Sequence, residues 1–125
     1  MHLNHLNLTV SELSETREFF EEVFGFKCIV SRGNALVVLV GDAGFSLTLN
    51  QFKKVAEFSY PDDFNVFHVG FQQPSRGRVD EIHGALTAAG YEPPAIREYH
   101  GAWTFYLRVP GGFFVEVFYQ QRMDR

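Results

Sequence analysis

The stretch Asn65-Val66-Phe67-His68-Val69-Gly70-Phe71 repeats, about halfway along the chain, the pattern of the opening segment Asn4-His5-Leu6-Asn7-Leu8. Each segment places one histidine inside a short apolar run that has the character of a β-strand. A helical pattern follows each segment and ends at a glycine and an aromatic residue, Gly25-Phe26 in the first copy and Gly90-Tyr91 in the second. Internal repetition of this kind indicates a fold built from two copies of one unit.

Both copies continue after the helical pattern with three further strand patterns. In the first copy these are residues 26–32, 35–40 and 45–50, and in the second copy they are residues 95–99, 103–109 and 113–119. The order βαβββ therefore occurs twice. Two helices cannot cover both faces of eight strands, so we predict an α+β fold in which the two modules form a curled mixed sheet around a cup.

The chain of 125 residues is long enough for one compact domain. Apolar periodicity lapses after residue 51, and Tyr60-Pro61-Asp62-Asp63 has the composition of a turn. We therefore expect a single domain made of two modules, about residues 1–51 and 65–121, joined by a linker over residues 52–64.

Composition excludes several classes of partner. The net charge is −4, with acidic and basic residues interspersed, so no basic stripe is present to bind nucleic acid. No run approaches the roughly 18 apolar residues of a membrane span, and no signal peptide is recognisable. A single cysteine, Cys28, fits a reducing compartment. We expect a soluble cytoplasmic protein whose partner is a small molecule, with no nucleic acid and no membrane.

Strand alternation sorts the polar side chains of both modules onto one face. Because side chains alternate between the two faces of a strand, the more polar face of each strand should line the cup, and the other face should pack against the helices. The predicted lining comprises His5, Asn7, Thr48, His68, Tyr106, Arg108 and Glu116.

Three residues of this lining, His5, His68 and Glu116, form a candidate metal-binding set. Two imidazoles and one carboxylate suit Fe²⁺ or Mn²⁺, with Ni²⁺, Co²⁺ and Zn²⁺ as further candidates, and leave positions open for substrate. A lone strand histidine is more often a half-buried residue held by a hydrogen bond. Glu116 lies between apolar residues, and burying an unpaired carboxylate there would cost several kcal/mol. A cation is a good partner for it.

The two βαβββ halves, with His5, His68 and Glu116 at strand positions, resemble the vicinal oxygen chelate superfamily, which includes glyoxalase I, extradiol dioxygenases, fosfomycin-resistance enzymes and bleomycin-resistance proteins. The resemblance covers roughly residues 2–120. It implies that the histidine of the first strand in each half and the glutamate of the last strand bind a divalent metal. Glyoxalase I has a further carboxylate ligand where this sequence has Thr48, which counts against glyoxalase I itself.

The segment from His100 to Glu116 resembles the extradiol dioxygenase signature, in which a histidine, a tyrosine, a proline-glycine turn and the ligand glutamate follow in this order. The resemblance implies that His100 is an acid/base or oxygen-stabilising group and that Tyr106 donates a hydrogen bond to substrate. Val109 departs from the signature, which usually has a polar residue there. We expect Arg108, Asn7 and Thr48 to contact the substrate.

Ring cleavage of the extradiol type is the slightly favoured activity, and the alternatives remain open. They are a non-catalytic protein that sequesters a small molecule or antibiotic, as bleomycin-resistance proteins do, a fosfomycin-resistance-like thiol transferase, and a glyoxalase-like lyase. An accessory domain of a biosynthetic pathway is a further alternative. Family members of this length commonly form homodimers, so we expect a homodimer. The sequence leaves open whether the metal ligands meet within one chain or across two.

Overall fold

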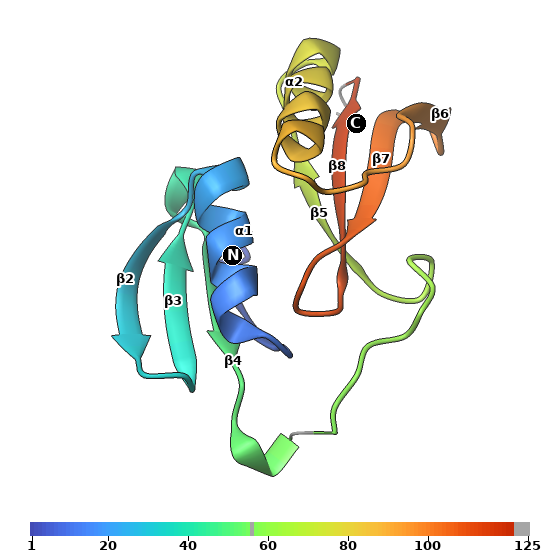
Figure 1. Cartoon of the computed structure of the whole chain (residues 1–125). Coiled ribbons are helices and arrows are strands. Elements are labelled where there is room, and N and C mark those ends of the chain that lie inside the picture. Colours follow the sequence, from blue (N-terminus) through green and yellow to red (C-terminus); the bar gives the residue numbers. More distant parts are fainter. Residues whose placement is uncertain (56, 122–125) are drawn as a thin grey trace. The chain divides into compact units, whose positions relative to one another are not determined.

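The computed structural model of the protein describes residues 1–55 and 57–121. Both modules have the order βαβββ, so the predicted α+β fold of two modules is confirmed (Figure 1). The first module comprises β1 His5–Thr9, α1 Leu13–Phe24, β2 Lys27–Arg32, β3 Leu36–Val40 and β4 Ser46–Asn50. The second comprises β5 His68–Gln72, α2 Arg76–Ala88, β6 Arg97–Tyr99, β7 Ala102–Arg108 and β8 Phe114–Gln120. Two short 3₁₀ segments, η1 Asp42–Gly44 and η2 Lys53–Val55, lie outside this pattern.

The eight strands divide equally between two separate sheets. The chain packs as two compact units, one formed by residues 1–60 with 109–112, and the other by residues 61–108 with the chain from 113 onward. Each unit contains one four-stranded sheet and one helix. The segment predicted as linker contains η2, so part of it has local structure.

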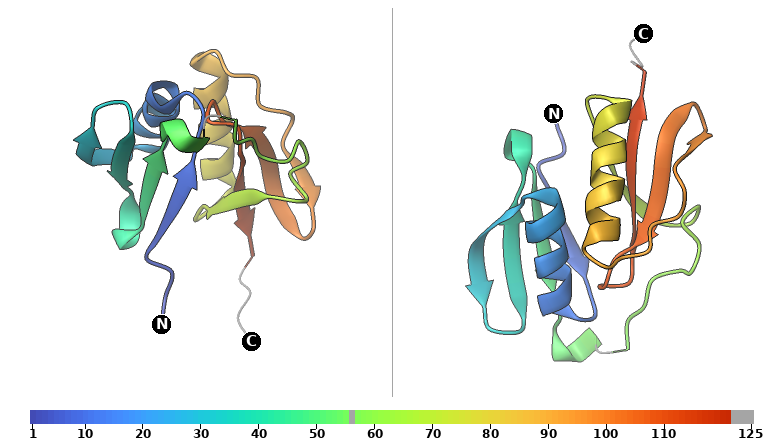
Figure 2. Two further views of the ribbon diagram at one scale, coloured as in Figure 1. Left: turned by 90° about the horizontal axis from the view of Figure 1, so that it is seen from below. Right: turned by 45° about the horizontal axis from the view of Figure 1, so that its top comes forward.

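In the first unit the strand order is β1-β4-β3-β2, with β1 parallel to β4 and the other neighbours antiparallel. Helix α1 covers one face of this sheet, against β3 and β4 (Figure 2). Its apolar stripe is wholly buried at Phe19 and Phe20, and Leu39, Leu47 and Leu49 of the sheet are buried with it. The opposite face of β1 carries the polar side chains of the alternation, as the sequence predicts.

The second unit repeats this arrangement with the strand order β5-β8-β7-β6. Helix α2 packs against β7 and β8, and Phe105, Val115 and Val117 are buried among its residues Val79 and Leu86. The alternate residues of β7 and β8, among them Tyr106 and Glu116, belong to the other face of the sheet. One face of the sheet is therefore committed to the core, and the other is available for a site.

The start of α1 depends on a residue that is distant in the sequence. Glu12 occupies the cap position with φ 53°, and its side chain makes no capping hydrogen bond. The amide N–H of Leu13 instead donates to Oε1 of Gln51, at 2.8 Å. A side chain distant in sequence satisfies the helix end, and local propensity cannot reveal such a partner. At the other end Gly25 forms the predicted cap, with φ 73°.

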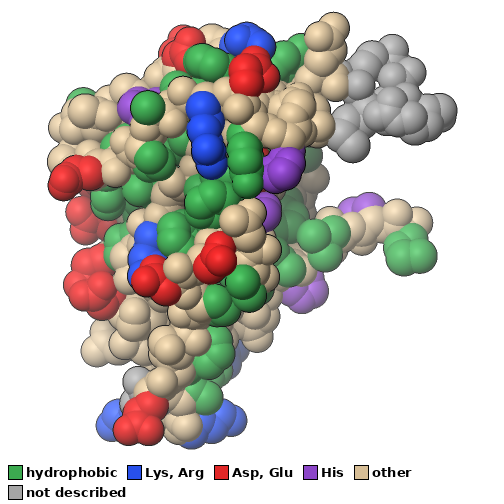
Figure 3. Space-filling model, turned by 90° about the vertical axis from the view of Figure 1, so that its right-hand side faces the viewer, with side chains coloured by type: hydrophobic (Ala, Val, Ile, Leu, Met, Phe, Trp, Pro, Cys, Tyr) green, Lys and Arg blue, Asp and Glu red, His purple; other side chains and the backbone are tan. Residues whose placement is uncertain are grey.

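No helix within the described part of the chain is long and apolar enough to cross a membrane. On the face shown in Figure 3, acidic and basic side chains are interspersed among apolar and polar ones. This distribution agrees with the mixed charge of the sequence.

Candidate functional site

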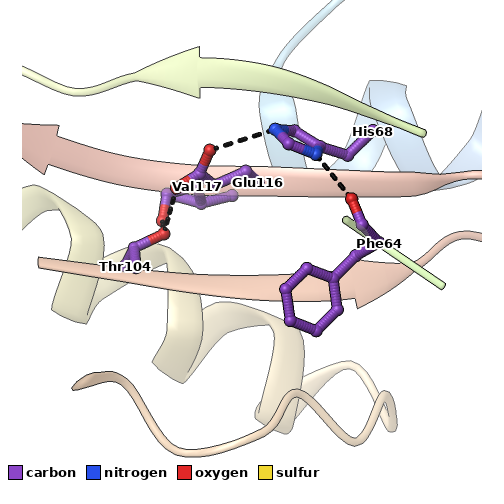
Figure 4. Close-up of polar contacts among 5 residues, drawn as sticks. All are labelled: Phe64, His68, Thr104, Glu116 and Val117. Carbon is purple, nitrogen blue, oxygen red and sulfur yellow. Dashed lines mark hydrogen bonds and ion pairs between the residues drawn. The ribbon is translucent and has the colours of Figure 1, made fainter. Parts of the chain in front are cut away.

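The parallel pairing of β5 with β8 brings His68 and Glu116 together on the open face of the second sheet (Figure 4). Nε2 of His68 lies 3.4 Å from Oε1 of Glu116. The side chain of His68 is 34% exposed and that of Glu116 only 13%. A carboxylate and an imidazole, both partly withdrawn from water, thus point at one another from adjacent strands.

The imidazole of His68 is oriented by its other ring nitrogen. Nδ1 lies 2.7 Å from the backbone oxygen of Phe64. Because a carbonyl oxygen can only accept a hydrogen bond, Nδ1 carries the proton and donates it. Nε2 is then the nitrogen that can offer a lone pair toward Glu116. Holding the second nitrogen in this way is how proteins orient histidines that bind metals.

The carboxylate of Glu116 is held in a similar way. The hydroxyl of Thr104, a fully buried residue, donates to Oε2 of Glu116 at 2.7 Å. This leaves Oε1 facing His68, as Figure 4 shows. On β5 the residue directly beside Glu116 is Gly70, whose missing side chain leaves space over the carboxylate.

Tyr106 flanks Glu116 on the other side, because the two residues are register partners on β7 and β8. The pKa of Tyr106 is raised to about 12, chiefly by burial and then by the negative charge of Glu116 and a hydrogen bond with that carboxylate. The phenol is therefore neutral at physiological pH, and it can donate a hydrogen bond but cannot act as a base.

Aromatic rings surround the pair. The ring of Phe64 stacks on that of Tyr106, with centroids 4.0 Å apart and planes inclined by 17°. His68 meets Tyr106 edge to face at 5.1 Å, and Phe114 and Tyr99 lie about Phe64 at 6.0 and 6.4 Å. Rings of this kind lower the local polarity and offer flat surfaces for a planar ligand.

The donor atoms fit a divalent metal. Metal–nitrogen and metal–oxygen bonds of about 2.0–2.2 Å allow two ligand atoms to lie up to roughly 4 Å apart on one ion, and Nε2 of His68 and Oε1 of Glu116 are 3.4 Å apart. Among the described residues of the second unit, no other His, Cys, Asp or Glu joins this pair to make a group of three.

The first unit contains the counterparts of these residues. His5 begins β1 as His68 begins β5, and its Nδ1 lies 3.0 Å from Oδ1 of Asn4. Thr48 on β4 lies beside Asn7 on β1, and Glu116 on β8 lies beside Gly70 on β5. Thr48 therefore occupies in the first sheet the position that Glu116 occupies in the second. Asn7 accepts a hydrogen bond of 2.7 Å from the side-chain amide of Asn50. This face is thus polar but lacks a carboxylate at the position of Glu116.

Two other predicted site residues have contacts of their own in the second unit. His100 forms the β6–β7 turn with φ 53°, a left-handed conformation that is uncommon outside glycine, and its ring lies 3.9 Å from that of Tyr99. Arg108 lies 2.9 Å from the carboxylate of Asp62 and donates to the backbone oxygen of Pro61 at 3.2 Å. The structure therefore brings together His68, Glu116 and Tyr106.

Three residues of the site were not singled out from the sequence. Thr104 shares a strand face with Tyr106, so the alternation of β7 was a usable signal for it. Gly70 follows His68 by two residues on the same face. Phe64 lies in the segment predicted as linker, where no periodicity marks it.

Each module thus has the order βαβββ, with His5 and His68 on the first strands and Glu116 on the last strand of the second module. The sequence profile of the Glyoxalase/Bleomycin resistance protein/Dioxygenase superfamily matches residues 2–117. The chain belongs to this superfamily.

Solved structures show the same fold. A structure described as a possible glyoxalase from Bacillus cereus is 44% identical, with a TM-score of 0.81 and coverage of 94% of this chain and 97% of that one. Lactoylglutathione lyase from Agrobacterium tumefaciens is 22% identical, with a TM-score of 0.74 and coverage of 94% and 92%.

A third relative is the fosfomycin resistance protein FosX from Listeria monocytogenes, whose E126Q mutant was solved with Mn(II) and 1S,2S-dihydroxypropylphosphonic acid. It is 22% identical, with a TM-score of 0.74 and coverage of 93% of this chain and 90% of that one. No curated protein sequence matches the chain.

Proposed function

We propose that the protein is a divalent-metal-dependent enzyme that acts on a small substrate bound through two adjacent oxygen atoms. The observation that carries this proposal is the His68–Glu116 pair, in which Nε2 and Oε1 face one another at 3.4 Å while Nδ1 and Oε2 are held by Phe64 and Thr104. Both ligand atoms are thus preorganised, as a metal site requires. His5 is the third proposed ligand, with Fe²⁺ or Mn²⁺ favoured over Ni²⁺, Co²⁺ and Zn²⁺.

The bound ion would supply Lewis acidity to the substrate oxygens. The chain's own residues would bind and orient the substrate around it. Tyr106 is placed beside Glu116 and stays protonated, because its pKa is raised to about 12, so it would donate a hydrogen bond to a substrate oxygen that gains negative charge. Phe64 and Phe114 would exclude water from one side. Asn7, Thr48 and Arg108 remain proposed substrate contacts.

For the reaction, ring cleavage of the extradiol type remains our first candidate. The aromatic rings of Phe64, Tyr99 and Phe114 around the pair favour a planar substrate, and His100 would be the acid/base group. The position of His100 at the β6–β7 turn gives that assignment no direct support. A second candidate is a lyase or fosfomycin-resistance type of reaction, because the lyase and FosX structures share this fold, and FosX was solved with Mn(II) and a vicinal diol.

The experiment that tests the proposal is metal analysis of untagged protein purified without chelator. We expect about one metal ion per chain in the wild type and a loss of nearly all of it in His68→Ala and Glu116→Gln. The matched controls are His2→Ala and Glu81→Gln, which change exposed residues that are not proposed as ligands. Equal metal content in wild type and the two ligand variants would refute the proposal.

The alternative is that the protein binds a small molecule or antibiotic without catalysis, in the manner of bleomycin-resistance proteins. Tight binding of an aromatic small molecule to metal-free protein, with no turnover of catechols or vicinal diols by metal-loaded protein, would favour this alternative. Oxygen uptake with catechols by the iron form would instead establish ring cleavage.

A further inference from the structure

We propose that Thr104 is a positioning residue that restricts Glu116 to binding the metal through a single oxygen, Oε1. The inference rests on the proposed function, since it concerns the same pair of ligands. It assigns to a buried hydroxyl a role in setting how many coordination positions remain for substrate.

The contact between the two side chains is short and protected from water. The hydroxyl of Thr104 lies 2.7 Å from Oε2 of Glu116, and Thr104 is 0% exposed. A hydroxyl has only one proton to donate. The second acceptor near the Thr104 hydroxyl is the backbone oxygen of Val117, which is more distant at 3.4 Å. The proton is therefore directed mainly at Oε2. A hydrogen bond to an ionised acceptor is roughly twice as strong as one between neutral groups.

Threonine is suited to this task because of its stiffness. Two heavy atoms on Cβ restrict rotation about χ1, and complete burial leaves no water to replace the carboxylate as acceptor. Thr104 lies on β7, the strand next to β8, so the backbone ladder between these strands fixes the distance between the two residues. The hydroxyl of Thr104 therefore holds Oε2 of Glu116 in a fixed position.

The other oxygen of Glu116 is open on the side of His68. Oε1 faces Nε2 of His68 at 3.4 Å, and the neighbouring position on β5 is Gly70. A Cβ atom placed at Gly70 would lie 3.7 Å from Oε1 and 3.2 Å from the ring of Phe118. A side chain at this position would therefore crowd the ring of Phe118 and approach Oε1 of Glu116.

A carboxylate can bind a metal through one oxygen or through two. Binding through two oxygens would require the carboxylate to rotate until Oε2 also faces the ion, which would distort the short hydrogen bond that Oε2 accepts from the buried hydroxyl of Thr104. With Oε2 held, Glu116 occupies one coordination position rather than two. The coordination position that Glu116 leaves open is then available to the second oxygen of a substrate that binds the metal through two adjacent oxygens.

The test compares Thr104→Val, which replaces the hydroxyl by a methyl group, with Thr104→Ser, which keeps the hydroxyl. Mn²⁺ binding is followed by loss of the electron paramagnetic resonance signal of free Mn²⁺, and X-ray absorption counts the ligands of bound Mn²⁺. Loss of a residue that supports a metal ligand typically weakens metal binding by about 10–100-fold. We expect a loss in this range for Thr104→Val, with one more oxygen ligand, and near-wild-type behaviour for Thr104→Ser.

The outcomes separate the inference from the proposed function. Wild-type protein that takes up no Mn²⁺ overturns both. Wild-type binding that Thr104→Val leaves unchanged, in affinity and ligand number, overturns only the role of Thr104. Equal losses in Thr104→Val and Thr104→Ser, with equal drops in the melting temperature of the metal-free proteins, assign Thr104 to packing and overturn it as well.

Discussion

Single hydrogen bonds decide which atoms of His68 and Glu116 face one another. The backbone oxygen of Phe64 requires the proton of His68 to be on Nδ1, and the hydroxyl of Thr104 occupies Oε2 of Glu116. Neither partner is a charged residue, and neither belongs to the three predicted ligands. At the residue scale, the chemistry of the pair is therefore set by neutral groups that surround it.

Tyr106 gives a prediction on pH at this scale. Its pKa rises from 10.0 to about 12 on folding, so the folded state favours the neutral phenol. The resulting stabilisation is complete below pH 10 and is lost as the pH rises through 12. In a phenolate absorbance titration of metal-free protein, we expect Tyr106→Phe to remove part of the absorbance that develops near pH 12.

Tyr60 is the control for this titration, because its pKa is also raised to about 12, chiefly by burial. Tyr60→Phe should remove a similar part of the late absorbance. Metal loading should shift only the contribution of Tyr106 to lower pH, because a bound cation offsets the negative charge of Glu116. If the absorbance that develops near pH 12 were as large in Tyr106→Phe as in wild type, the raised pKa would not belong to Tyr106.

At the scale of elements, strand pairing places the site and tight contacts hold the strands. Gly41 follows β3, and a Cβ atom at this position would lie 2.7 Å from the ring of Phe26. Because the ring of Phe26 is buried and packs against that of Phe20, with centroids 5.6 Å apart, we expect Gly41→Ala to lower the free energy of unfolding by about 1–3 kcal/mol, as overpacking does. Urea denaturation measures this change.

Gly84 in α2 is the matched control. A Cβ atom there meets nothing within 4 Å, and the residue is exposed within a helix. Gly84→Ala should raise the free energy of unfolding by about 0.5–1 kcal/mol, because alanine loses less conformational freedom than glycine in a helix. Destabilisation by both substitutions to the same extent would show that the contact with Phe26 is not the cause.

At the scale of the whole molecule, the proposed third ligand, His5, belongs to the first unit, while His68 and Glu116 belong to the second. We predict a homodimer, so sedimentation equilibrium should give twice the chain mass of 14.3 kDa. A mass that stays at that of one chain at micromolar concentration would show the prediction to be wrong.

Hybrid dimers of His5→Ala and Glu116→Gln chains would locate the third ligand. If ligands from two chains form each site, one site of the hybrid contains both substitutions and the other contains none, so the hybrid binds half the metal of wild type. If all ligands come from one chain, each site of the hybrid is defective and metal binding stays low. Homodimers of each variant, which lack intact sites in either case, are the controls.

Periodicity made most of the fold predictable. The two βαβββ patterns, the cap at Gly25 and the division of each strand into a buried and a polar face follow from residues close together in the sequence. The start of α1 could not be predicted in the same way, because the acceptor at its end is Gln51, far along the chain.

The sequence by itself determined the superfamily, the two modules and the face on which His68, Tyr106 and Glu116 lie, because strand alternation and repetition are local patterns. The tertiary structure alone decided which atoms of these side chains meet. That depends on the register between β5, β7 and β8, strands that are distant in the chain. Thr104 joined the site for this reason, because the pairing of β7 with β8 brings its hydroxyl within reach of Glu116. Phe64 joined it through the turn that precedes β5, in which its backbone oxygen meets His68 four residues further on.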